Sequence, residues 1–389
     1  MLLSRSAQLG ALVLAVSVSA WGLPGVQAIS YTAVDLHPTG VTNSLATGID
    51  GGVIAGAAGP IGLAPYPNYP FMFASAYQWT DTTSSSAANI NPSGQTYSRI
   101  NGVSAGQLIG TGQYLGAFHA LLWTTPTTTV DLNGEFETSF GIGIAGNQQV
   151  GLANGTATDF SDHAILWSGS ALNPVDLHVA SITPPGGEPI IFTESIAYGT
   201  SGAKQVGNQT FTDIDFFTNS HAFLWSGSAS SFVDLNGDLF GSSAYGIDGD
   251  DQVGMGYVSE DGNKHALLWN NTAASVIDLT PATMDVAEAW AVRDGTQVGY
   301  GSFFGEEGLI SHAMAWQGSA ESAVDLHAYL PAGYTDSQAF AIDSDGTIVG
   351  FARTETGQMH AVAWIATVPE PATAGLLLLG VSLLLRRRR

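Results

Sequence analysis

One five-residue pattern recurs along most of this chain. His-Ala-x-x-Trp occurs six times, and a seventh, altered copy reads Ser75-Ala76-Tyr77-Gln78-Trp79. The intact copies begin and end at His119 and Trp123, His163 and Trp167, His221 and Trp225, His265 and Trp269, His312 and Trp316, and His360 and Trp364. Successive tryptophans are 44, 44, 58, 44, 47 and 48 residues apart, close to the length of one propeller blade. Each repeat therefore predicts about one blade.

Every repeat predicts four short strands. An Ala-x-Gly-Ile-like stretch, such as Ala244-Tyr245-Gly246-Ile247, is followed by a polar turn and an apolar pair ending in glycine, such as Val253-Gly254. The His-Ala-x-x-Trp segment comes next, and a Val-Asp-Leu segment follows after a short gap. Apolar runs separated by Gly, Asp and Asn are typical of strands joined by tight turns.

The last predicted strand of the array is displaced to its beginning. Val34-Asp35-Leu36 has no preceding tryptophan, and the repeat that ends at Trp364 has no Val-Asp-Leu segment of its own. We expect the early strand to pair beside residues 360–364, because closure removes exposed strand edges. A β-solenoid is the alternative, but it needs no displaced strand. The sequence predicts an all-β fold, a seven-bladed β-propeller of four-stranded blades over residues 29–366, with the ring closed by the N-terminal strand.

Both ends of the chain predict sorting signals. Residues 1–28 combine a basic start at Arg5, an apolar run and small residues before position 28, which is typical of an export signal. Residues 367–389 contain Pro369-Glu370-Pro371, an uncharged apolar run over 372–385 and four terminal arginines. The order of these three parts resembles the PEP-CTERM sorting signal of Gram-negative bacteria that make exopolysaccharide. That resemblance implies an exosortase-type peptidase as a partner, transient insertion of the tail into the inner membrane, and a location at the cell surface or in the extracellular matrix. A permanent C-terminal anchor is the alternative.

The repeats themselves resemble the HAF repeat family, whose His-Ala-Phe signature stands unaltered at His221-Ala222-Phe223. The resemblance covers nearly all of the chain between the two terminal signals. It implies an extracellular protein and brings no established biochemical activity.

Charge limits the partners that the chain can bind. Without the two terminal signals, 5 of the 10 basic and 32 of the 33 acidic residues remain, which gives a formal charge of −27. Such a surface repels phosphates, so nucleic acid is excluded as a partner. The chain has no cysteine, so its stability must come from packing and backbone pairing. We expect no cofactor. Ca²⁺ is the one ion considered, because Asp343-Ser344-Asp345-Gly346 and Asp248-Gly249-Asp250-Asp251 resemble parts of Ca²⁺ loops. Turn formation explains the same residues.

The repeated histidines predict structure rather than chemistry. Equivalent positions in successive blades lie too far apart to share one metal ion. We therefore expect each histidine to be a buried, hydrogen-bonded spacer beside a core tryptophan, and each aspartate of Val-Asp-Leu to bond to a turn.

The long insertions predict a binding surface. They fall between the second and third strands of a blade and between consecutive blades, so all of them emerge on one face. The ligand-binding candidates there are Tyr66, Tyr69, Phe71, Phe211, Asp213, Asp215, Phe216 and Phe217. Smaller contributions are expected from Phe303, Phe304, Glu306 and Glu307. Aromatic surfaces beside carboxylates suit sugar rings. The alternative is that these loops pack on one another over the channel mouth.

No motif of nucleophilic, metalloprotease or phosphate-loop chemistry is present. The sequence favours a non-catalytic surface or matrix protein that binds or organises extracellular polysaccharide. One alternative is a glycan-degrading enzyme that uses two of the carboxylates of Glu188, Glu194, Asp213 and Asp215. The other is a purely structural coat protein.

Overall fold

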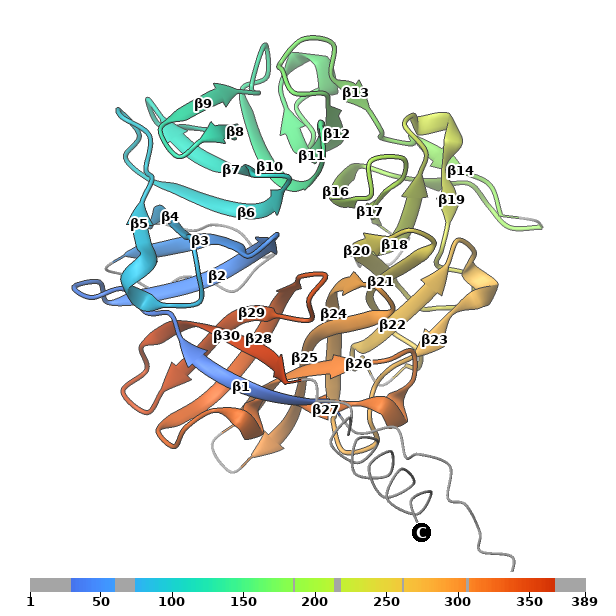
Figure 1. Ribbon diagram of the computed structural model, residues 1–389. Helices are drawn as coiled ribbons and strands as arrows, with labels where there is room; N and C mark the ends of the chain where they lie inside the picture. The colour runs from blue at the N-terminus through green and yellow to red at the C-terminus, as the bar shows by residue number, and fades with distance from the viewer. Residues whose placement is uncertain are drawn as a thin grey trace, which may run out of the picture. The chain divides into compact units, whose positions relative to one another are not determined.

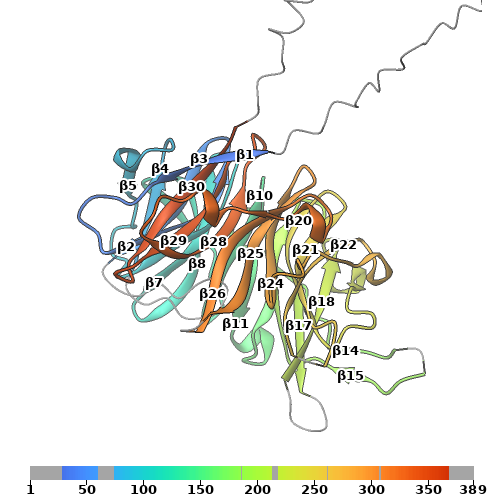
Figure 2. The same ribbon diagram turned by 90° about the horizontal axis from the view of Figure 1, so that it is seen from below.

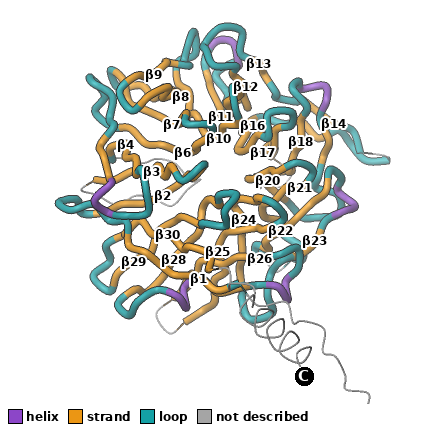
Figure 3. Tube along the Cα trace, viewed as in Figure 1, coloured by secondary structure: helices purple, strands orange, loops and turns teal. Residues whose placement is uncertain are grey.

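Seven four-stranded sheets follow one another around a closed ring (Figures 1 and 3). The computed structural model describes residues 29–59, 74–184, 186–212, 218–260, 262–305 and 308–367. Residues Tyr31–Thr367 form one unit. The predicted seven-bladed β-propeller is confirmed. The predicted export signal, residues 1–28, and the predicted C-terminal signal after Thr367, with Pro369, Glu370 and Pro371, lie outside the described residues.

We call the four strands of each blade a, b, c and d, in the order in which they are given below; they follow one another from the centre of the ring outward. Blade 1 consists of β2 (Asn43–Asp50), β3 (Val53–Gly59), β4 (Ser75–Trp79) and β5 (Ala87–Asn89). Blade 2 consists of β6 (Ser98–Ser104), β7 (Gln107–Tyr114), β8 (Ala117–Thr125) and β9 (Thr128–Asp131). Blade 3 consists of β10 (Thr138–Ala145), β11 (Gln148–Asn154), β12 (His163–Trp167) and β13 (Val175–Asp176). Blade 4 consists of β16 (Glu194–Thr200), β17 (Gln205–Thr212), β18 (Thr218–Trp225) and β19 (Val233–Asp234).

The remaining blades repeat the arrangement. Blade 5 consists of β20 (Ser242–Asp248), β21 (Asp251–Gly256), β22 (His265–Asn270) and β23 (Ile277–Asp278). Blade 6 consists of β24 (Val286–Arg293), β25 (Thr296–Gly305), β26 (Gly308–Trp316) and β27 (Val324–Asp325). Blade 7 consists of β28 (Tyr334–Ile342), β29 (Ile348–Thr354), β30 (Met359–Thr367) and β1 (Ser30–Asp35).

Short elements connect the blades. A small hairpin of β14 (Ser181–Ile182) and β15 (Ile190–Ile191) lies between blades 3 and 4. Single 3₁₀ turns are η1 (Ser84–Ser86), η2 (Thr156–Thr158), η3 (Ala229–Ser231), η4 (Ala273–Ser275), η5 (Ala320–Ser322) and η6 (His327–Tyr329). Four of these, η1, η3, η4 and η5, stand between strands c and d, where the sequence predicted plain hairpins.

The first strand of the chain closes the ring. β1 is the outer neighbour of β30, the last strand. The amide of Leu36 donates to the carbonyl of Ala361 (2.8 Å), and the ring of His360 contacts Asp35 through Nδ1 and Oδ2 (2.8 Å). Closure therefore gives blade 7 the same four strands as the other blades.

A β-bulge interrupts the pairing of strands a and b in every blade, always at the residue that corresponds to the x of the Ala-x-Gly-Ile-like stretch. Ala and Gly both flank it in blades 1, 4 and 5, and Ala, Gly or Ile flanks it in the others. The bulge brings a carbonyl of strand a against the glycine of the Val-Gly pair on strand b. A Cβ placed on Gly254 would lie 1.9 Å from the Ser243 carbonyl oxygen, and all seven equivalent glycines meet a carbonyl at 1.8 to 2.1 Å. Only glycine fits there, which explains the repeated Val-Gly.

The seven repeated tryptophans fill the spaces between blades. All of them are less than 2% exposed. Three indoles also donate to the backbone of the preceding blade, as Trp79 does to the carbonyl of Leu36 (2.9 Å). Each tryptophan therefore belongs to a blade interface, where aromatic burial contributes most.

The ring has two unlike faces, seen on edge in Figure 2. We call the face that carries the b–c and d–a connections the loop face, and the face that carries the a–b and c–d connections the hairpin face. The β14–β15 hairpin belongs to the loop face.

Candidate functional site

Each repeated histidine is bonded to the aspartate of the neighbouring d strand. The six Nδ1 to Oδ2 distances lie between 2.7 and 2.9 Å, for His119–Asp131, His163–Asp176, His221–Asp234, His265–Asp278, His312–Asp325 and His360–Asp35. The other oxygen of each aspartate accepts the backbone N–H two residues later. The histidine side chains are 13 to 21% exposed, so they are hydrogen-bonded as expected but not fully buried. The reason is that the pair lies at the outer c–d edge of each blade.

The residue two positions after the aspartate links neighbouring blades. It is asparagine in three blades, threonine in blade 5, and histidine in blades 3, 6 and 7. Where it is histidine, its ring stacks on the repeated histidine at 3.9 to 4.2 Å between ring centres. Burial, and then the adjacent His163 ring, lower the pKa of His178 to about 4. Burial and a neighbouring histidine likewise lower the pKa of His37 and of His327.

The serines that contact these stacked histidines are structural. Ser195 Oγ lies 3.0 Å from His178 Nδ1 and also accepts the N–H of Ala164 in the previous blade (2.8 Å). Ser195 is completely buried, as are Ser44 and Ser337 in the equivalent contacts of the other two stacked pairs. A nucleophile must reach its substrate, so these Ser–His contacts hold blades together and do not form a hydrolase site.

Most of the predicted ligand-binding residues lie outside the described part of the chain. These are Tyr66, Tyr69, Phe71, Asp213, Asp215, Phe216 and Phe217, and Glu306 and Glu307 do so as well. Phe211 is described, and it is half-buried against Phe192 and His221. Glu188 and Glu194 are exposed on the loop face.

The loop face nevertheless carries a distinct set of exposed apolar side chains. Of the thirteen large apolar residues exposed in the described ranges, eight belong to b–c or d–a connections and their flanking strand ends: Tyr114, Leu115, Phe160, Ile191, Phe240, Val258, Phe304 and Leu309. The other five, Leu172, Val175, Val233, Val276 and Ile277, lie at the outer c–d edge. None of the thirteen lies at an a–b turn. The gathering of exposed apolar groups on one face is typical of a binding surface.

Two of these side chains sit on left-handed backbone. Leu115 is 93% exposed with φ of 50°, and Phe160 is 62% exposed with φ of 62°. This conformation is costly for bulky residues, and Asn-Gly is the usual choice where Leu115-Gly116 stands. Backbone strain at an exposed residue, where no buried contact offsets it, is typical of functional positions.

On the hairpin face, carboxylates join the turns of successive blades. Asp50 accepts the N–H of Ala105, Asp248 that of Asp294 and Asp343 that of Gly52, each at 2.8 Å. Asp248 and Asp343 belong to the segments that resemble Ca²⁺ loops. Among the described residues, no three histidine or carboxylate side chains come together in a way that could hold a metal ion.

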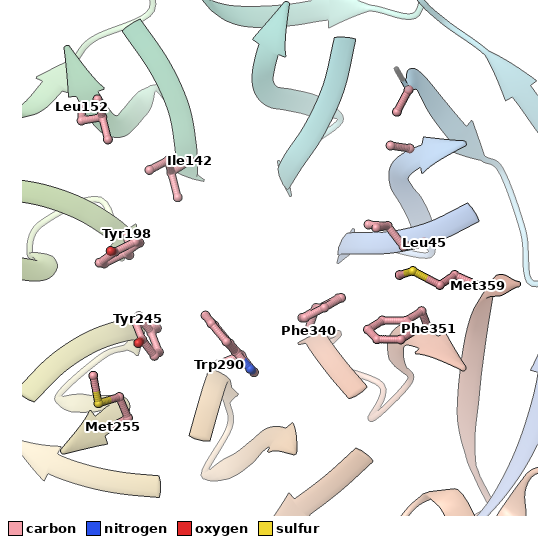
Figure 4. Close-up of a cluster of buried hydrophobic side chains, with 12 residues drawn as sticks. Leu45, Ile142, Leu152, Tyr198, Tyr245, Met255, Trp290, Phe340, Phe351 and Met359 are labelled. Atoms are coloured by element: carbon pink, nitrogen blue, oxygen red, sulfur yellow. The ribbon is translucent and has the colours of Figure 1, made fainter. Parts of the chain in front are cut away.

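A cavity of about 610 Å³ is lined by the first strands of all seven blades and by turn residues of the hairpin face. Its lining includes the seven bulged residues, which are Thr47, Asn101, Ile142, Tyr198, Tyr245, Trp290 and Phe340. Figure 4 shows side chains of the last four, with Ile142 and Leu45, arranged around the centre of the ring. The cavity is therefore on the side of the ring that the sequence did not predict.

Charged groups from the turns also line this cavity. Arg293 reaches from blade 6 to Asp50 of blade 1 (3.6 Å), and Lys204 binds Asp250 (2.6 Å) and Asn271 (2.7 Å). Asp248 is a third lining carboxylate. Three acids and two bases thus surround the opening, and both bases face acids.

Two groups of residues were missed by sequence reasoning. Exposed loop residues such as Leu115 lie in short connections, whereas the predicted binding surface was placed on the long insertions. The bulged residues occupy the x position of the Ala-x-Gly-Ile-like stretches, where Thr, Asn, Ile, Tyr, Tyr, Trp and Phe follow one another along the chain. The variation at this one position of a repeated stretch was the available signal.

Searches with the sequence against protein-family models and against curated proteins give no match. The structure is similar to the β-propeller domain of the Trilobed protease from Pyrococcus furiosus, with a TM-score of 0.53 and 12% identity over 83% of this chain and 95% of that one. It is also similar to the acylaminoacyl peptidase of Pyrococcus horikoshii, with a TM-score of 0.50 and 13% identity over 89% of this chain and 55% of that one. At such identities the likeness shows the propeller fold alone. No helix within the described ranges is long and apolar enough to span a membrane.

Proposed function

We propose that this chain is an exported, non-catalytic surface or matrix protein that binds extracellular polysaccharide through the loop face. The observation that carries the proposal is the set of eight exposed apolar side chains on that face. Tyrosine and phenylalanine rings offer flat surfaces to the C–H faces of sugars, and leucine and isoleucine extend them.

The charges of the same face favour a neutral glycan. Exposed Glu188 and Glu194 can accept hydrogen bonds from sugar hydroxyls. The cations near this face are engaged, because Lys264 pairs with Glu288 (2.8 Å) and Arg353 with Asp336 (3.0 Å). A polyanionic chain would meet unbalanced negative charge, so we expect weak binding of uronate-rich or sulfated glycans.

The sorting signals support the location. Residues 1–28 fit an export signal, and residues 367–389 fit a tail processed by an exosortase-type peptidase. Both fit a protein that meets the exopolysaccharide outside the cell.

Affinity electrophoresis or pull-down with the producing bacterium's own exopolysaccharide tests the proposal. The test variant carries Leu115→Ser, Phe160→Ser and Phe304→Ser. The matched control carries Leu172→Ser, Val233→Ser and Ile277→Ser at the outer c–d edge, where the side chains are also exposed.

We expect the loop-face variant to bind at least about tenfold more weakly, since burying an apolar side chain contributes about 1 kcal/mol or more. The control should bind like the original protein. Equal loss in both variants, or no binding by the original protein, would remove the proposal. Release of reducing ends from the glycan would instead favour the glycan-degrading alternative.

A further inference from the structure

The ring of bulged residues departs from the symmetry of the repeat. Every blade forms the same bulge, and blades 1 to 3 form it with Thr47, Asn101 and Ile142. The fold therefore does not need an aromatic residue at this position. Blades 4 to 7 nevertheless place four aromatic side chains there in succession, Tyr198, Tyr245, Trp290 and Phe340. We call these four residues the aromatic arc.

The rings of the aromatic arc alternate between perpendicular and stacked contacts. Tyr198 meets Tyr245 edge to face (5.2 Å, 87°), Tyr245 stacks on Trp290 (4.4 Å, 17°), and Trp290 meets Phe340 edge to face (6.2 Å, 78°). All four residues line the cavity and are 6 to 9% exposed. The arc is thus one wall of the cavity, and Figure 4 shows its four side chains.

Carboxylates lie on the turn side of the aromatic arc. Asp50, Asp248 and Asp250 line the cavity at the turns, and Arg293 and Lys204 each face an acid there. Asp248 forms no ion pair with any described residue, and its Oδ2 accepts the N–H of Asp294. Behind the arc, the buried carboxylate of Glu288 is paired with Lys264 (2.8 Å), and burial followed by Glu288 raises the pKa of Tyr245.

We infer that this cavity binds a small organic cation of the quaternary ammonium class, held against the aromatic arc. A cation without N–H groups needs no hydrogen-bond acceptors and is attracted by the faces of aromatic rings, most strongly by tryptophan. The cavity of about 610 Å³ lies within the size range of small-ligand sites. The carboxylates of the opening and the negative charge of the whole protein raise the local concentration of cations.

This inference goes beyond the proposed function, since it uses the hairpin side of the ring and a different ligand class. The test is calorimetric titration of the full-length protein with choline and tetramethylammonium, together with intrinsic tryptophan fluorescence. The neutral control ligand is 3,3-dimethylbutan-1-ol, which has the shape of choline without its charge.

We expect both cations to bind, and the neutral alcohol to bind at least about tenfold more weakly. Trp290→Leu should weaken choline binding about tenfold, and Asp248→Asn a few-fold, because its amide oxygen can still accept the Asp294 N–H. Ile142→Leu, on the other side of the same ring, and the loop-face triple variant should bind choline like the original protein.

Equal affinity for choline and the neutral alcohol would overturn the inference, as would unchanged choline binding by Trp290→Leu. A lack of choline binding at about 50 mM ligand would also overturn it. Asp248→Asn keeps the test decisive if Trp290→Leu does not fold. Failure of glycan binding at the loop face would leave these results unaffected, so the two proposals fail separately.

Discussion

The strand framework and the loop face of this propeller follow opposite rules. In the framework, all seven blades repeat the same bulge, the same glycine opposite it and the same buried tryptophan. On the loop face, neighbouring blades differ in the length of their connections and in the apolar groups that they expose. Repetition marks what the ring requires, and departure from it marks where the chain can vary, which is where we place the proposed glycan-binding surface.

The largest effect should come from the framework. Replacing Gly254 by alanine places a Cβ 1.9 Å from the Ser243 carbonyl oxygen, so the bulge cannot form. We expect a loss of more than about 4 kcal/mol in the free energy of unfolding, or failure to fold. Gly94→Ala is the control, because Gly94 has φ of +85° but nothing within 4 Å of the added Cβ. It should lose only about 1 kcal/mol. Urea unfolding measures both, and similar losses would show that the glycine is not dictated by the bulge.

An effect of intermediate size should come from the position two residues after the repeated aspartate, which is histidine in blades 3, 6 and 7. The pKa of His178 is about 4 in the folded chain against 6.5 ordinarily. Between these values the unfolded chain binds more protons, so stability falls as the pH is lowered from 6.5 toward 4. His178→Asn should remove this dependence, because asparagine does not titrate. It should also keep the contact with Ser195, since Asn133 of blade 2 and Asn236 of blade 4 each accept a hydrogen bond from the serine of the following blade.

From pH 7 to pH 5 we expect the original protein to lose about 1 kcal/mol more than His178→Asn, with allowance for solvent screening of a half-exposed group. Urea unfolding at the two pH values measures the difference. Equal losses would mean that the protonation of His178 is not linked to stability.

The smallest effect should come from the loop face. Leu115→Asn suits the left-handed backbone at φ of 50°, and Leu115 is 93% exposed. We expect the variant to be more stable by about 0.5 to 1 kcal/mol and to bind glycan more weakly. Thermal unfolding measures the gain in stability, and pull-down measures the loss of glycan binding. A variant that is more stable and binds glycan equally well would show that Leu115 is strained for another reason.

The sequence predicted the ring because its signals are local and repeated. The Trp spacing set the blade count, and the displaced Val34-Asp35-Leu36 predicted closure, which β1 beside β30 confirms. The pairing of each histidine with its aspartate was not predicted. It depends on the register of strands c and d, which brings residues 12 or 13 positions apart together in five of the blades.

The cavity could not be predicted from the same signals. The aromatic part of its wall takes one residue from each of blades 4 to 7, and each of these four residues lies at a bulge. Bulges have no reliable sequence signature, apart from the glycine that faces them. Leu115 was missed for a different reason, since Leu115-Gly116 lies in a two-residue turn that is too short to suggest a site.

Sealing a repeat array with its own first strand has a consequence for how such a protein can evolve. An open solenoid tolerates duplication or loss of one unit, because each unit contacts only its neighbours. In this ring an eighth blade would either separate β1 from β30, which pair within one sheet, or change the angle between neighbouring blades at every interface. Copy number is therefore fixed, and variation is confined to side chains and connections within the seven existing units.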